Sequence, residues 1–236
     1  MDADTGNKIK LRTGFTTGSC ATAASKAGIL AIINQKVIEE VNIILPKRSR
    51  LKIRVDSCEF TNNAAKCSVI KDGGDDPDVT HGAAIFVDVE LTNVIGDIEI
   101  DGGEGVGRVT KPGLGLEIGG AAINPTPKKM ILENAREVGE ELLEKNGIKI
   151  VVSVPKGKEL GPKTDNPRIG IMGGISILGT SGIVIPYSTA SFAAAIRQQI
   201  SVVNTMNDDS VVLTTGGRSE DFARKIIDLP DPVSYT

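Results

Sequence analysis

The sequence predicts an α+β protein in which a mixed or antiparallel sheet with packed helices comes first and a smaller α/β, Rossmann-like layer follows. Between residues 40 and 91, four runs rich in Val and Ile are broken by Pro, Gly and Asn, which is typical of strands. After residue 164, strand-like and helix-like segments alternate with glycine-rich loops, which is typical of a parallel layer. We therefore expect two domains, 1–163 and 164–236, joined through a turn-rich segment at 155–163.

The first domain should begin with a helix from residue 20 to about residue 34. Ser19 can cap this helix, and small apolar residues such as Ala23 and Ala27 recur at helical spacing. A second helix should start where Pro127 follows Thr126, because proline suits the first helical position, and it should end by Gly147. Its apolar stripe is Ile131, Ala135, Val138 and Leu142. The strands are expected at 40–45, 51–60, 65–71, 83–91 and 148–154.

The second domain should contain two strands and two helices. Because two strands cannot cover both faces of such helices, this layer looks incomplete at its C-terminal end, so that either further sequence is missing or the end leans on a partner. The expected elements are a strand at 169–172, a helix at 188–203, a strand at 211–214 and a helix at 220–227.

Composition limits the classes of partner and compartment. The 27 Lys and Arg residues against 30 Asp and Glu give a net charge of −3, which is too near balance for a nucleic-acid binder. Charges, Gly or Pro interrupt each apolar run before the ~20 residues that a membrane helix needs. The three cysteines have no C-x-x-C spacing, and no signal peptide precedes them. We therefore expect a cytoplasmic protein that binds neither nucleic acid nor membranes.

Hydroxyl residues and glycines lie directly before the first expected helix, among them Thr16, Thr17 and Ser19. Free backbone N–H groups at a helix start favour an anionic group, so this loop is a candidate for ligand binding. It lacks the G-x-x-x-x-G-K-[ST] pattern of a P-loop. The alternative is that Thr17 or Ser19 only caps the helix and that the glycines only turn the chain.

Basic residues alternate through positions 48–54. On a strand, residues two apart lie on the same face at ~7 Å intervals, so these side chains would form a row while the residues between them face the core. The row could hold several ligand carboxylates, or it could be a solvated outer face of the sheet. Its members are Arg48, Arg50, Lys52 and Arg54.

His81 is the only histidine, so a multi-histidine metal site is excluded and a Ser-His-Asp triad would have to use it. The acidic segment 72–78 before it resembles a calcium loop in composition, without the regular spacing and terminal Glu of an EF-hand. The alternative is a solvated acidic turn in which Asp78 caps the next element. We assign no metal ligand to the chain.

Three glycine-rich loops remain. Residues 102–108 hold four glycines together with Glu104 and Arg108, which suggests backbone within contact distance of something flat or bulky, unless this is only a glycine-rich hairpin. Residues 172–176 and 214–219 each follow an expected strand, where α/β sheets bind nucleotides. Neither loop matches G-x-G-x-x-G, so the pattern alone is a weak indication.

Long blocks of the sequence are distinctive. They are residues 11–21 (LRTGFTTGSCA), 78–82 (DVTHG), 102–114 (GGEGVGRVTKPGL), 122–125 (AINP), 166–184 (NPRIGIMGGISILGTSGIV), 196–199 (IRQQ) and 214–220 (TTGGRSE). Together they resemble the cobalt-precorrin-5B C-1-methyltransferase family. Members of that family usually continue well past the last of these blocks, so the resemblance implies that part of the methyl-donor domain is absent.

The resemblance implies transfer of a methyl group from S-adenosylmethionine to C-1 of cobalt-precorrin-5B, giving cobalt-precorrin-6A in anaerobic cobalamin synthesis. Cobalt would be carried by the tetrapyrrole substrate and not by the protein. An electron-rich ring carbon can attack a sulfonium methyl directly, so the enzyme's task would be to align two ligands and exclude water. Residues 1–163 would be the tetrapyrrole side and 164–236 the donor side. A homo-oligomer, or contact with other corrin-pathway enzymes, stays open.

The resemblance also suggests roles for single residues. Basic groups would meet the carboxylates of the tetrapyrrole, and glycines would let backbone approach its ring. Substrate-binding candidates are Thr16, Thr17, Ser19, Arg48, Arg50, Gly102, Gly103, Gly105 and Arg108. Donor-binding candidates are Gly173, Gly174, Ser176, Thr215, Gly216, Gly217 and Arg218. Candidates for handling a proton are Asp78, His81 and Glu104. A small-molecule kinase and a noncatalytic tetrapyrrole carrier are the alternatives.

Overall fold

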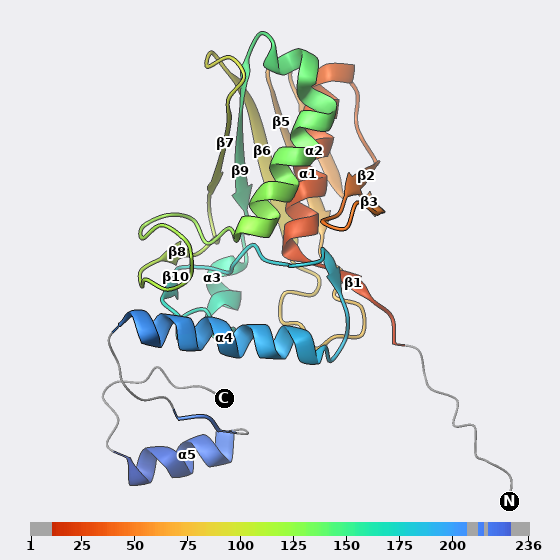
Figure 1. Ribbon diagram of the computed structural model, residues 1–236. Coiled ribbons are helices and arrows are strands. Elements are labelled where there is room, and N and C mark those ends of the chain that lie inside the picture. Colours follow the sequence, from red (N-terminus) through yellow and green to blue (C-terminus); the bar gives the residue numbers. More distant parts are fainter. Residues whose placement is uncertain (1–10, 207–211, 215–216, 228–236) are drawn as a thin grey trace, which may run out of the picture.

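The computed structural model describes residues 11–206, 212–214 and 217–227 (Figure 1). Its largest element is a five-stranded sheet in which every neighbouring pair is antiparallel except the last, where the edge strand runs parallel to its neighbour. This confirms the mixed sheet expected for the N-terminal part. In spatial order the strands are β4 (Ser57–Phe60), β5 (Ala64–Ile70), β6 (Ala84–Thr92), β9 (Gly147–Ser153) and β7 (Ile98–Gly102).

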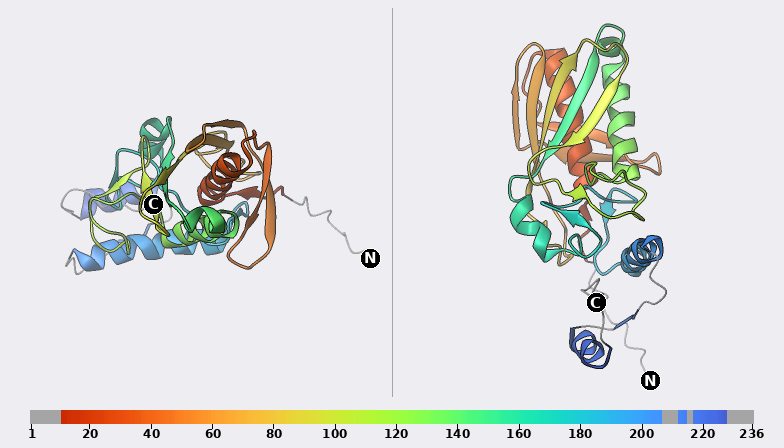
Figure 2. Two further views of the ribbon diagram at one scale, coloured as in Figure 1. Left: turned by 90° about the horizontal axis from the view of Figure 1, so that it is seen from above. Right: turned by 90° about the vertical axis from the view of Figure 1, so that its left-hand side faces the viewer.

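Helices α1 (Thr17–Asn34) and α2 (Pro125–Leu143) pack against each other on one face of this sheet (Figures 1 and 2). The hairpin of β2 (Glu40–Ile44) and β3 (Arg50–Arg54) contacts α1 from another side, so that α1 is enclosed. Small side chains make this possible: a Cβ added to Gly28 would lie 2.7 Å from Cγ2 of Val89. The helix is buried because alanine, glycine and serine let the neighbouring backbones approach.

The start of α1 differs from the prediction. Thr16 is the N-cap, and its side-chain oxygen accepts a hydrogen bond from the backbone N–H of Ser19 at 3.2 Å. The expectation that Ser19 or Thr17 caps this helix is therefore wrong. Thr16 has extended backbone angles because it follows the short strand β1 (Gly14–Phe15), and this leaves its hydroxyl beneath the first turn.

The start of α2 also lies earlier than expected. Asn124 occupies the N-cap position without a side-chain capping hydrogen bond, and Thr126 lies inside the helix. The apolar stripe is confirmed, since Ile131 and Ala135 are fully buried and Val138 and Leu142 pack against the same core.

Two features of the sheet were not foreseen. The run 51–60 is two strands, because β3 pairs with β2 while β4 pairs with β5. β7 was not predicted at all. It is an edge strand whose five residues are mostly half-exposed, so it lacks the continuous apolar pattern of the central strands.

The chain after residue 164 does not confirm the Rossmann-like layer within the described residues. β10 (Ile171–Met172) pairs antiparallel with β8 (Arg108–Val109), and β11 (Ile183–Val184) pairs antiparallel with β1. Residues 212–214 are in no strand, and residue 211 lies outside the described range. The two helices are present as α4 (Thr189–Thr205) and α5 (Gly217–Ile226).

The expected turn-rich segment at 155–163 contains α3 (Gly157–Leu160) and a 3₁₀ helix, Gly161–Lys163. The main core crosses the predicted domain boundary, because Ile175 and Ile177 belong to the same buried cluster as Val106 and Val154. A smaller cluster joins Val109 to residues of the later chain. The division at residue 163 remains a prediction. No helix in the described ranges is long and apolar enough to cross a membrane.

Candidate functional site

Two of the predicted ligand loops lie against each other in the structure. The backbone N–H of Ile175 donates to the carbonyl of Gly105 at 3.0 Å, and that of Gly107 donates to the carbonyl of Ile175 at 2.9 Å. A Cβ on Gly174 would overlap the Gly105 carbonyl. Candidate substrate and donor segments, some 70 residues apart in sequence, are thus joined by direct backbone contact.

The glycines of the 102–108 loop are required mainly by the protein's own chain. Gly105 has φ +70, and a Cβ there would overlap the carbonyl of Val154. Side chains added at Gly102 and Gly103 would overlap Val106 and Ser153, respectively. The backbone at these glycines does lie very close to other atoms, but those atoms belong to the protein, and contact with a ligand stays a prediction. The loop is therefore neither a stretch of open backbone facing solvent nor a plain glycine-rich hairpin.

Gly173 differs from its neighbours in the second loop. It has φ +80, and a Cβ there would meet no atom within 4 Å. Ser176, by contrast, is buried, and its hydroxyl donates to Oδ1 of Asn166 at 3.0 Å. Of the residues proposed for the donor in this loop, only Gly173 presents open backbone.

Arg108 forms the principal ion pair of this region. Its Nη1 and Nη2 donate to Oδ1 and Oδ2 of Asp101 at 2.8 and 3.2 Å, and Nη2 also donates to the carbonyl of Gly102. The hydrogen bond from Arg108 lowers the pKa of Asp101, so the carboxylate stays ionised at neutral pH. Because the guanidinium is 43% exposed, it can still meet a ligand from the solvent side while Asp101 fixes its orientation.

A cavity of about 340 Å³ lies beside this ion pair. Its wall combines the edge of β7, the 115–121 loop and the first turn of α2, and it carries apolar side chains together with three charged residues. The lining residues are Ile100, Asp101, Gly115, Leu116, Glu117, Gly120, Ala121, Ile123, Pro125 and Lys128. Convergent polar groups in a partly apolar hollow are what a small-molecule subsite requires.

The predicted row of basic residues does not line this cavity, and three of its four members are paired with acids. Arg48 is in the β2–β3 turn with φ 64, so placing it on the strand is wrong, whereas Arg50, Lys52 and Arg54 do alternate with the inward side chains of β3. Nη2 of Arg50 lies 2.5 Å from Glu137, and Nζ of Lys52 lies 2.6 Å from Glu40.

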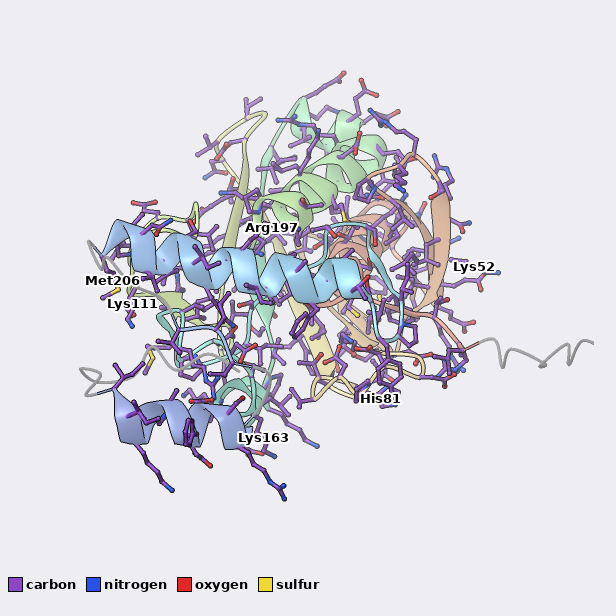
Figure 3. The ribbon with its side chains drawn as sticks, turned by 60° about the horizontal axis from the view of Figure 1, so that its bottom comes forward. Lys52, His81, Lys111, Lys163, Arg197 and Met206 are labelled. Atoms are coloured by element: carbon purple, nitrogen blue, oxygen red, sulfur yellow. The ribbon has the colours of Figure 1, made fainter. Side chains whose placement is uncertain are left out.

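Arg48 likewise pairs with Glu133 on α2. Figure 3 shows Lys52 at the far side of the molecule from Lys111, which follows β8. The row is therefore largely neutralised by acids of the protein, and none of its four residues lines the cavity.

The hydroxyl groups of Thr16, the N-cap of α1, and of Thr17 and Ser19 in its first turn make hydrogen bonds within the protein. Ser19 Oγ donates to the carbonyl of Gly182 at 2.7 Å, and Thr17 Oγ1 accepts from the backbone N–H of Leu178 at 2.9 Å. Thr16, Thr17 and Ser19 are all buried. This favours a capping and packing role over the anion-binding alternative.

Asp78 and His81 lie in one loop. Oδ2 of Asp78 accepts from Nζ of the buried Lys71 at 2.5 Å, and Oδ1 accepts from Thr80. Burial alone would raise the pKa of Asp78, but the hydrogen bonds from Lys71 and Thr80 outweigh it, so the pKa lies below its ordinary value. Asp78 is thus held as a structural carboxylate.

His81 is 53% exposed, and its Nδ1 accepts from the backbone N–H of Gly73 at 3.0 Å. Glu104 is also exposed, and its carbonyl accepts from Val154. Among the described residues, no hydrogen bond or ion pair joins Glu104 to Asp78 or His81. The three candidates for proton transfer therefore do not form one group.

Acidic residues of the segment before His81 bind other segments of the same chain through an ion pair and hydrogen bonds. Asp72 pairs with the guanidinium of Arg12, Asp75 accepts from the backbone N–H of Arg12 at 2.6 Å, and Asp76 accepts from that of Tyr187 at 3.0 Å. Across the described ranges, no three His, Cys, Asp or Glu side chains are grouped to hold a metal ion.

The last predicted donor loop is only partly described. Thr215 and Gly216 lie outside the described residues, Gly217 begins α5, and Arg218 is exposed. The sequence interpretation missed Lys128 and Asp101, which line the cavity. The position of Lys128 in the first turn of a predicted helix could have marked it as a candidate. Nothing in the sequence indicated that the 115–121 loop would lie opposite this turn.

The chain is similar in sequence to proteins of one family. The family model described as CbiD matches residues 4–186. A cobalt-precorrin-5B C(1)-methyltransferase of Priestia megaterium is 52% identical over 216 residues, covering 92% of this chain and 59% of that protein. The protein of the same name from Geobacillus sp. strain WCH70 is 53% identical over 218 residues, covering 92% and 60%. The chain thus spans about three fifths of the length of these curated relatives.

A solved structure is also similar. The crystal structure of a cobalamin biosynthesis protein (cbiD) from Archaeoglobus fulgidus is 31% identical in sequence, with a TM-score of 0.56, and the match covers 97% of this chain and 75% of that one. The family match extends from before β1 to β11, and so includes both glycine loops, the Arg108–Asp101 pair and the cavity. The chain belongs to the CbiD family.

Proposed function

We propose that this chain functions in the methylation of C-1 of cobalt-precorrin-5B, with S-adenosylmethionine as the methyl donor. The observation that carries the proposal is the identity of about half of all residues, over 92% of the chain, with curated relatives of that name. The reaction type is also compatible with the residues present. A carbon nucleophile supplied by the acceptor needs no activated Ser, Cys or His, and the side chains around the cavity include none.

The proposal places the acceptor on the 1–163 side, at Arg108 and the neighbouring cavity. Arg108 is directed by Asp101 and half-exposed, so it is suited to orient a carboxylate of the acceptor. Gly102, Gly103 and Gly105 would act by shaping the loop that carries Arg108. Thr16, Thr17 and Ser19 would act indirectly, by fixing the segment 178–182.

The proposal places the donor on the 164–236 side, near the open turn at Gly173, with Thr215, Gly216, Gly217 and Arg218 as further candidates. β8 pairs with β10 on one side and bridges to Ala121 on the other. The Gly173 turn and the cavity therefore lie on either side of a single two-residue strand, which is compatible with two ligands held next to each other. An α/β layer completed around α4 and α5 remains part of this proposal.

An anaerobic assay tests the function. The chain is incubated with cobalt-precorrin-5B and methyl-labelled S-adenosylmethionine, with the Priestia megaterium relative as positive control. We expect label in a product that has the mass of cobalt-precorrin-6A. Tight binding of the tetrapyrrole without label transfer would favour the carrier alternative. ATP-dependent phosphorylation of a small molecule would favour the kinase alternative.

A further inference from the structure

We propose that the cavity between the edge of β7, the 115–121 loop and the first turn of α2 binds one carboxylate-bearing edge of the acceptor, with Lys128 as the cation that recognises it. This inference rests on the proposed function, because it takes the acceptor to be the polycarboxylate tetrapyrrole. It assigns the recognition to a residue outside all the sequence motifs described above.

The size and wall of the cavity fit an edge of a large ring. A volume of about 340 Å³ is at the lower end of the range for small-molecule pockets, so it admits part of a tetrapyrrole and not the whole. Ile100, Leu116, Ile123 and Pro125 form an apolar wall against which ring carbon atoms can pack.

The charges around the cavity single out Lys128. Asp101 is neutralised by the two-point contact with Arg108, so it does not repel an incoming anion at full strength. Glu117 is exposed on the loop. Lys128 forms no ion pair with a carboxylate of the described residues, and the residue is exposed. It is therefore available to a ligand.

The position of Lys128 in α2 strengthens this assignment. It lies in the first turn, where the partial positive charge of the helix end adds to the side-chain charge. Pro125 and Pro127 have no N–H group, so recognition here depends on the side chain more than on the backbone.

Three other basic side chains considered for this task are already paired with acids. Arg48 and Arg50 pair with Glu133 and Glu137 on α2, and Lys52 pairs with Glu40. Binding a ligand there would mean displacing an existing partner, whereas at Lys128 it would not.

The test compares Lys128→Gln with Lys129→Gln. Both lysines are exposed residues of α2, both changes remove one charge, and only Lys128 lines the cavity. Binding of cobalt-precorrin-5B is followed anaerobically by its absorbance, and binding of S-adenosylhomocysteine by calorimetry. Circular dichroism checks that each variant is folded.

We expect the acceptor Kd to rise about tenfold in Lys128→Gln, which corresponds to the loss of one charge-assisted hydrogen bond, and to change less than about twofold in Lys129→Gln. Lys128→Arg should retain most of the affinity, and donor binding should be unchanged in all three variants. The difference between the two Gln variants should also shrink at high salt.

Equal acceptor affinity in the two Gln variants would overturn the assignment of Lys128 while leaving the proposed function intact. If the unaltered chain binds no cobalt-precorrin-5B, both the proposed function and this inference fail. A loss of donor binding in Lys128→Gln, with acceptor binding unchanged, would reassign the cavity to the donor and overturn the inference.

Discussion

The carboxylate of Asp78 lies 2.5 Å from the ammonium nitrogen of Lys71, whose side chain is 2% exposed. A lysine buried so completely needs a counter-ion, because an unpaired charge in the interior is strongly unfavourable. The loop that carries Asp78 and His81 therefore has a structural task, whatever part it takes in ligand binding.

We expect Asp78→Asn to lower the free energy of unfolding by about 3–5 kcal/mol at pH 7, because Lys71 would remain buried without its partner. Asp75→Asn is the control: Asp75 is exposed and accepts only a backbone N–H of Arg12, so its loss should change stability by less than about 1 kcal/mol. Urea denaturation measures both. Equal effects would contradict the structural role of Asp78.

The same pair predicts a pH dependence. Because the pKa of Asp78 is lowered in the folded state, its contribution is fully present above the unfolded value of about 4 and is lost as pH falls through the folded pKa. The unaltered chain should therefore lose more stability than Asp78→Asn does as the pH falls below about 4. Denaturation midpoints of both proteins, measured as a function of pH, test this prediction. Equal losses of stability in the two proteins would refute it.

The contact between the two glycine loops predicts a matched pair of substitutions. Gly105 and Gly115 have nearly the same backbone angle, with φ +70 and +67, but only Gly105 is enclosed. Gly115→Ala should lower stability by about 1–2 kcal/mol through backbone strain alone. Gly105→Ala should lower it by a further 1–3 kcal/mol or so, because the added methyl group overlaps Val154. Similar values from chemical denaturation would mean that this contact is loose.

Glu137 predicts unequal effects for its two basic partners. It pairs with the exposed Arg50 and the buried Lys26, and Lys26 also donates to the carbonyl of Asn42 at 2.7 Å. Arg50→Ala should change stability by less than about 1 kcal/mol. Glu137→Gln should lower it by about 1–3 kcal/mol, because the buried Lys26 loses the negative charge that neutralises it. Thermal unfolding of the two variants should show clearly different midpoints.

The cap of α1 gives a further prediction. Thr16→Ala should lower stability by about 0.5–2 kcal/mol, and Thr16→Ser should recover most of that loss because the hydroxyl is kept. Thr126, which the sequence suggested as the cap of α2, lies inside that helix, so Thr126→Ala should change stability by less than about 0.5 kcal/mol. A large loss of stability in Thr126→Ala would indicate that Thr126 caps α2 and that the helix starts later than Pro125.

Arg108 connects structure to the proposed function. Arg108→Ala should weaken the binding of cobalt-precorrin-5B at least about tenfold and leave the affinity for S-adenosylhomocysteine unchanged. Arg108→Lys should restore little, because an ammonium group cannot make the two-point contact with Asp101. Titration with each ligand is the measurement, and equal acceptor affinity in all three proteins would remove Arg108 from the site.

Local patterns predicted most of the N-terminal part. The Val- and Ile-rich runs marked β2, β5, β6 and β9, and the stripe through Ile131 and Ala135 marked α2. The helix starts were less predictable. Several hydroxyl residues stand near the start of α1 and backbone geometry selects among them, whereas α2 begins after Asn124, which makes no side-chain capping hydrogen bond. Thr16 became the cap of α1 only because β1 places it in an extended conformation.

Long-range pairing was the main source of error. A two-residue strand such as β10 has no periodicity of its own, and its partner β8 lies more than 60 residues earlier in the chain. The pattern of strands and helices suggested a parallel layer, whereas the ladder that forms is antiparallel. Prediction of the site was limited by the same lack of long-range information. The glycines indicated a close contact, but whether the contact is with a ligand or with protein depends on which segment lies opposite.

The enclosure of α1 has a consequence for how this protein can vary. A helix surrounded by sheet, hairpin and a second helix has no outward side on which a larger residue could be accommodated, so substitutions from Thr17 to Ile29 should be far less tolerated than those on the charged outer side of α2. A saturation library scored for folded protein should therefore show α1 as more restricted than the other helices that the structure describes, although none of its residues need touch a ligand.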